Sequence, residues 1–147
     1  MGERIDAARG QGPDATSGER DAEAGTTRHV MVIEDNDAIR EGFRLALADA
    51  GWEVTVFADG RKALEHLRSG GPLPGLILLD LMMPEMDGRQ FRREQKAEPA
   101  LAEIPTLFVT AARSTVPIEG ARVLRKPIDL DVLLEIVALE LARPRAS

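Results

Sequence analysis

The sequence contains no cysteine. Disulfide frameworks and thiolate metal sites are therefore excluded, and nothing in the chain requires an oxidising compartment. The sequence also has no apolar run that approaches the roughly 20 residues needed to cross a bilayer. Its polar N-terminus lacks the apolar stretch of a secretory signal peptide. We therefore expect a cytoplasmic protein that makes no contact with the membrane.

The chain is also short of positive charge. It carries 19 Lys and Arg residues against 25 Asp and Glu residues, which gives a formal net charge of −6. A protein that binds the phosphate backbone of nucleic acids needs a basic face to displace counterions. We therefore expect no direct nucleic-acid partner.

The length and composition predict one folded domain and a flexible tail. The chain has 147 residues, of which 44% are hydrophobic, enough for the core of a single domain. Residues 1–28 contain almost no large apolar side chain except Ile5. Such a segment cannot bury enough surface to offset the entropy lost on ordering. We predict a flexible N-terminal tail over 1–28, or else an arm that folds on a partner, and a folded domain over 29–147.

Short apolar runs alternate with helical periodicity from His29 onward. The pattern predicts strands at 29–33, 54–57, 76–79, 106–110 and 123–125, and helices at 37–50, 60–68, 88–97 and 129–142, the second of them capped by Asp59. Parallel neighbouring strands need crossover connections, which these helices supply. The predicted fold is therefore α/β, with a doubly wound five-stranded parallel sheet covered by helices on both faces.

Polar side chains follow the ends of four predicted strands. In parallel sheets of this kind ligands sit beyond the carboxyl ends of the strands. The residues at those positions are Glu34, Asp35, Asp80, Thr110 and Lys126. Carboxylates brought this close repel one another, so at least one pKa should rise unless a cation intervenes. We predict a Mg²⁺ site, because Mg²⁺ binds through one or two carboxylates together with phosphate oxygens.

The same set of residues suits phosphoryl transfer. A carboxylate can act as a nucleophile and form an aspartyl phosphate, and Asp80 is the candidate. The ammonium of Lys126 and the hydroxyl of Thr110 can hold the remaining phosphoryl oxygens. Taken singly, each feature has a plainer explanation: an acidic pair after a strand is usually a solvated loop or a helix cap, and Thr110 alone is more often structural. Their joint occurrence at strand ends is what favours a chemical site.

Four sequence runs together resemble the receiver domains of two-component response regulators. They are VIEDN at 32–36, LLDLMMPEMDG at 78–88, VTA at 109–111 and KP at 126–127. The resemblance covers about residues 29–142 and implies a flavodoxin-like sheet of order 2-1-3-4-5. It also implies that Asp80 is the phosphoacceptor and that Mg²⁺ is bound by Asp35, Asp80 and the backbone carbonyl of Met82. Glu34 matches a position that reaches the ion mostly through water.

The resemblance assigns the phosphate-binding roles as well. Thr110 and Lys126 match the family's phosphate-binding hydroxyl and lysine, and the family commonly has a cis peptide before the proline that is Pro127 here. These matches imply a single-domain response regulator, not an enzyme, which receives its phosphoryl group from a histidine kinase or a phosphotransfer protein. Because few residues follow Arg143, we expect output through an unidentified downstream protein or a phosphorelay.

Two departures from the family pattern leave an alternative open. The family usually has an aromatic residue where Val123 stands, and the stretch between Thr110 and Val123 is short and broken by Pro117 and Gly120. We therefore expect a shortened fourth helix and an altered switch. The alternative function is a phosphorylation-independent protein-interaction module on the same fold. A dehalogenase-type hydrolase would need Asp-x-Asp at the nucleophile, and Asp80 is not followed by that second Asp.

Overall fold

The computed structural model describes residues 28–83, 86–111 and 121–143. The elements in chain order are β1 (His29–Ile33), α2 (Asp37–Asp49), β2 (Glu53–Phe57), α3 (Gly60–Leu67), β3 (Leu76–Asp80), α4 (Gly88–Lys96), α5 (Pro99–Ala102), β4 (Thr106–Thr110), β5 (Arg122–Arg125) and α6 (Leu130–Ala142). Within these three ranges no helix combines the length and apolarity needed to cross a bilayer.

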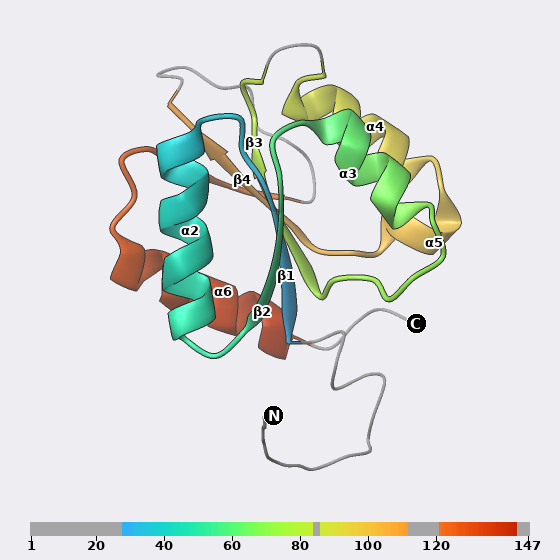
Figure 1. The fold of residues 1–147 in the computed structure, drawn as a ribbon. Helices are drawn as coiled ribbons and strands as arrows, with labels where there is room; N and C mark the ends of the chain where they lie inside the picture. The colour runs from blue at the N-terminus through green and yellow to red at the C-terminus, as the bar shows by residue number, and fades with distance from the viewer. Residues whose placement is uncertain (1–27, 84–85, 112–120, 144–147) are drawn as a thin grey trace.

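The five strands form one parallel sheet in the order β2-β1-β3-β4-β5. Helices α2 and α6 pack on one face, while α3, α4 and α5 pack on the other (Figure 1). This arrangement confirms the predicted doubly wound α/β fold and its flavodoxin-like strand order. Parallel strands need crossovers, and the alternation of helices and strands along the chain supplies them.

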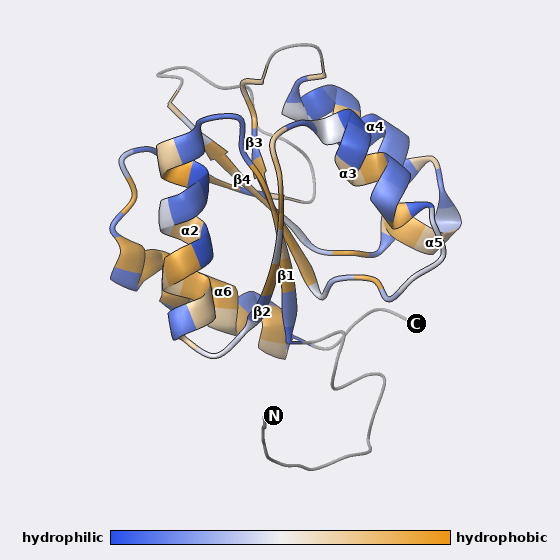
Figure 2. Cartoon of the chain, in the orientation of Figure 1, coloured by the Kyte–Doolittle hydropathy of each residue, from blue (hydrophilic) through white to orange (hydrophobic). Residues whose placement is uncertain are grey.

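Each face of the sheet has its own apolar core. Along β1 the side chains alternate, so that Val30 and Val32 face α2 and α6 while Met31 and Ile33 face α3 and α4. Strands β3 and β4 are buried over their whole length, as expected for central strands of a parallel sheet. Figure 2 shows this division, with hydrophobic central strands and largely hydrophilic outer surfaces on α3 and α4.

Side-chain caps begin the main helices directly after the loops that leave the sheet. Oxygens of Asn36, Asp59, Asp87 and Asp129 accept backbone N–H groups at the starts of α2, α3, α4 and α6. These interactions satisfy N–H groups that have no partner within the helix. The predicted last helix begins one residue later than expected, at Leu130, because Asp129 is its N-cap rather than its first turn.

Helix α5 was not predicted from the sequence. It is a single turn that begins at Pro99 and is held by a fully buried side chain. Gln95 Nε2 donates to the carbonyl oxygen of Leu101 in α5 and to that of Ile104 just after it, each at 3.0 Å. The predicted tail over 1–28 falls almost entirely outside the described residues, and so does the predicted shortened fourth helix.

Candidate functional site

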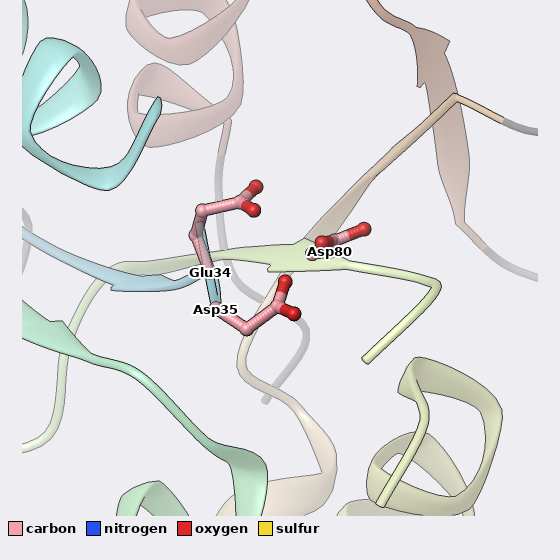
Figure 3. Close-up of side chains that lie close together, drawn as sticks. All are labelled: Glu34, Asp35 and Asp80. Atoms are coloured by element: carbon pink, nitrogen blue, oxygen red, sulfur yellow. The ribbon is translucent and has the colours of Figure 1, made fainter. Parts of the chain in front are cut away.

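Three carboxylates converge at the carboxyl edge of the sheet (Figure 3). Glu34 and Asp35 follow β1, and Asp80 is the last residue of β3. The two strands are neighbours, with Ile33 in register with Leu79, so the residues after them meet. One oxygen from each carboxylate lies within 4.8 Å of the others. The predicted convergence of the acidic pair with Asp80 is therefore confirmed.

The three carboxylates differ sharply in burial. Glu34 is 1% exposed and Asp80 4%, whereas Asp35 is exposed. Burial raises the pKa of Asp80 to about 7, and the neighbouring charge of Glu34 adds to the rise. The Met82 N–H and the Lys126 charge act against it. A raised pKa in this cluster was predicted from charge repulsion, but loss of solvation contributes more than repulsion does.

Lys126 supplies a positive charge to the two buried carboxylates. Its Nζ lies 2.9 Å from Glu34 Oε1 and 3.5 Å from Asp80 Oδ2. Burial acts to lower the pKa of Lys126, but interaction with Glu34 and Asp80 outweighs burial and raises that pKa above its ordinary value. The Lys126–Pro127 peptide is cis, and the backbone N–H of Lys126 donates to the Thr110 carbonyl at 2.8 Å.

Thr110 and Met82 complete the predicted set at the same edge. Asp80 is in register with Val109, so Thr110 stands one position further along β4, where it is fully buried. The backbone N–H of Met82 donates to Asp80 Oδ1 at 3.1 Å, and the Met82 side chain is 61% exposed. The structure thus brings every predicted site residue to one edge of the sheet, while their individual chemical roles remain predictions.

Two residues that support Glu34 were missed by the sequence analysis. The backbone N–H of Asn36 donates to Glu34 Oε2 at 3.1 Å, and Arg40 Nη1 donates to the Glu34 carbonyl at 3.0 Å. Arg40 also pairs with Asp37 at 2.6 Å. The spacing of Arg40 three residues after an acidic residue on a helix was an available signal for that pair. No signal in the sequence indicated that Arg40 contacts the Glu34 backbone.

The donor set fits a hard divalent cation. Glu34 Oε1 is buried and makes no aligned hydrogen bond with any described residue, although Lys126 Nζ lies near it. A buried carboxylate oxygen without a hydrogen bond is costly. Oxygen ligands from carboxylates are those that Mg²⁺ prefers. The combination of three clustered carboxylates and one incompletely satisfied oxygen therefore favours a cation at this edge.

Comparison with known proteins agrees with this geometry. The sequence model of the response regulator receiver domain family matches residues 30–138 of the chain. Over 125 residues the chain is 33% identical to response regulator Rre1 of Synechocystis sp., covering 80% of this chain and 53% of Rre1. Over 90 residues it is 34% identical to the transcriptional regulatory protein CseB of Streptomyces coelicolor, covering 61% of this chain and 36% of CseB. The chain thus spans less than two thirds of the length of either relative.

Among solved structures, the chain is similar to the chemotaxis response regulator CheY4 of Vibrio cholerae. The TM-score is 0.68 at 29% sequence identity, and the match covers 76% of this chain and 97% of that chain.

Proposed function

Because the chain belongs to the response regulator receiver domain family, we propose that it works as a signalling switch that accepts a phosphoryl group on Asp80. A receiver domain is a signalling protein rather than a classical enzyme, and it implies a histidine kinase partner. One observation carries the assignment: Asp80 is buried beside two other carboxylates and within 3.5 Å of the Lys126 ammonium. That environment combines a nucleophilic carboxylate with the groups needed to neutralise a phosphoryl group.

The acidic triad is typical of the Mg²⁺ site of receiver domains. In our proposal Asp35, Asp80 and the backbone carbonyl of Met82 hold the ion, and Glu34 reaches it through water. Bound Mg²⁺ would supply positive charge to the phosphoryl oxygens.

The chain's own residues account for the remaining steps. An oxygen of Asp80 attacks phosphorus, the new O–P bond forms, and the N–P bond to the kinase histidine breaks, leaving that histidine free. The Met82 N–H holds the other Asp80 oxygen, which fixes the direction of the carboxylate. Lys126 Nζ already lies beside Asp80, so its ammonium can hold one phosphoryl oxygen while the hydroxyl of Thr110 holds another.

For output we propose a single-domain regulator that acts through a partner protein or a phosphorelay. A phosphorylation-independent interaction module is the second candidate, and one observation favours it. Val123 on β5 packs against the core beneath α3 and α4, where the family usually has a mobile aromatic side chain. A small packed valine offers less movement to couple to phosphorylation.

Intact-mass spectrometry separates the two candidates. With Mg²⁺ and acetyl phosphate or phosphoramidate, we expect one added phosphoryl group on wild type and none on Asp80→Ala. Asp49→Ala, which removes an exposed carboxylate at the end of α2, is the matched control and should be labelled like wild type. Equal labelling of Asp80→Ala would remove Asp80 from its role. A wild type that takes no label would reject the switch and favour the interaction module.

A further inference from the structure

Met82 is the exposed methionine of the described residues. Its side chain is 61% exposed, whereas Met31, Met83 and Met86 are all at or below 8%. A peroxide must reach the thioether sulfur to oxidise it, so exposure controls which methionines react. Met82 should therefore react before the other three.

Met82 lies two residues after Asp80, in the loop that leaves β3, whereas the other exposed large apolar side chains belong to helices α2 and α6. Those others are Leu45 on α2 and Leu130, Val132 and Leu139 on α6. The backbone nitrogen of Met82 donates to Asp80 Oδ1 at 3.1 Å, and its Cα is one covalent bond from that nitrogen. The flexible, unbranched side chain can therefore reach the space in front of the Asp80 carboxylate.

We propose that Met82 is an oxidation site through which peroxides control how long a phosphoryl group stays on Asp80. In the modification the O–O bond of hydrogen peroxide breaks, one oxygen forms an S=O bond with the Met82 sulfur, and the remainder leaves as water. The sulfur is oxidised by two electrons and the peroxide is reduced. Methionine sulfoxide reductases reverse the change.

The effect on Asp80 rests on the proposed function. A thioether is a poor hydrogen-bond acceptor, while a sulfoxide oxygen is a strong one. Placed beside an aspartyl phosphate, this oxygen accepts a hydrogen bond from a water molecule and helps to orient it towards phosphorus. Oxidation therefore shortens the phosphoryl lifetime by about threefold or more. The effect stays below the 10²–10⁴-fold rate increase that a full general base provides.

The site of oxidation is tested first, without phosphorylation. The full chain is treated with hydrogen peroxide, digested, and mapped by mass spectrometry at several times. We expect Met82 to be oxidised roughly tenfold faster than Met31, Met83 and Met86, since it is exposed and they are buried. The peptide that contains Met1 is read separately. Oxidation of Met31 or Met86 at the rate of Met82, in protein whose Trp52 fluorescence is unchanged, would overturn the proposal.

The coupling is tested on protein oxidised in this way, with catalase added before phosphorylation so that peroxide cannot attack the acyl phosphate. Wild type and Met82→Leu, which keeps the side-chain volume, are phosphorylated with acetyl phosphate and Mg²⁺. After donor removal, decay is followed by intact mass. We expect a shorter lifetime in oxidised wild type, no change in Met82→Leu, and recovery after reductase treatment.

Two outcomes of the lifetime experiment separate a failure of the coupling from a failure of the proposed function. An unchanged lifetime in wild type with Met82 fully oxidised overturns the coupling but leaves the proposed function standing. A wild type that takes no phosphoryl group before oxidation rejects the proposed function, and the coupling with it, while the peptide map still decides whether Met82 is the oxidation site.

Discussion

Replacing Gly88 by alanine should damage both stability and the site. Gly88 is the first residue of α4, and its backbone N–H donates to the Leu81 carbonyl at 2.9 Å. A Cβ at Gly88 would lie 2.9 Å from Leu81 Cα and 3.0 Å from the Asp80 carbonyl oxygen. Both are backbone atoms, so relief requires the chain around Asp80 to shift.

Opposing contributions set the change in the free energy of unfolding of Gly88→Ala. Overpacking of this kind costs about 1–3 kcal/mol, and weakening the hydrogen bond to Leu81 adds about 0.5–1.5 kcal/mol. The lower entropy of the unfolded alanine chain offsets about 0.4–1 kcal/mol. We therefore expect Gly88→Ala to lower the free energy of unfolding by about 0.5–4 kcal/mol. A displaced Asp80 should also slow phosphorylation, by up to about 10²-fold for a shift near 1 Å.

Gly42→Ala is the matched control, because a Cβ at Gly42 in α2 meets nothing within 4 Å. The free energy of unfolding of this variant should rise by about 0.5–1 kcal/mol, since alanine is more favourable than glycine in a helix interior. Urea denaturation followed by the fluorescence of Trp52, the chain's one tryptophan, measures both variants. If Gly88→Ala unfolds within about 0.5 kcal/mol of wild type and is phosphorylated at the wild-type rate, the steric argument is wrong.

Three further predictions concern pH, metal and lifetime. Burial lowers the pKa of His29 below 6.5 in the folded chain, so its contribution to stability is fully present above pH 6.5 and is lost as pH falls through the lowered pKa. His29→Gln should remove that loss. If the free energies of unfolding of wild type and His29→Gln differ by the same amount at every acid pH, the prediction is wrong. Asp35→Asn should weaken Mg²⁺ binding and phosphorylation together, with Glu34→Gln milder, and a calorimetric titration in which Asp35→Asn binds Mg²⁺ like wild type would refute the ligand assignment. By resemblance to the receiver family, the side chains two residues after Asp80 and two residues after Thr110 are predicted to lie nearest the path of the attacking water. Met82→Asn combined with Ala112→Glu should therefore speed phosphate loss about tenfold, or about 1.4 kcal/mol of barrier. An unchanged decay at saturating Mg²⁺ would exclude these side chains as its determinants.

The architecture and the location of the site could be predicted because both depend on regular geometry. Apolar runs of strand length separated by helical periodicity allow few arrangements, and the carboxyl ends of parallel strands meet at one edge. Asp80 at the end of β3 and Lys126 just after β5 come together for that reason, although 46 residues separate them in the chain.

Features that depend on tertiary contacts could not be predicted. Helix α5 has only four residues, too short for a periodic pattern, and it is held by the buried amide of Gln95. Likewise, the sequence shows two adjacent acidic residues but does not indicate that Glu34 is buried while Asp35 is exposed. Glu34 extends the alternation of β1 beyond Ile33, but its ion-pair partner Lys126 lies 92 residues later in the sequence.

This difference in burial gives Glu34 and Asp35 different positions towards an incoming cation. With Glu34, Asp35 and Asp80 all ionised, the cluster has two more negative charges than positive ones, because Lys126 is the one ammonium that the described part of the chain pairs with it. Lys126 lies nearer to Glu34 than to Asp80, at 2.9 Å against 3.5 Å, so Asp80 is the less well neutralised of the two buried carboxylates. A divalent cation matches the missing charge, and it would meet Asp35 first because that carboxylate faces solvent. Glu34 pairs with Lys126 in the interior of this edge, while the exposure of Asp35 leaves the edge open to the ion.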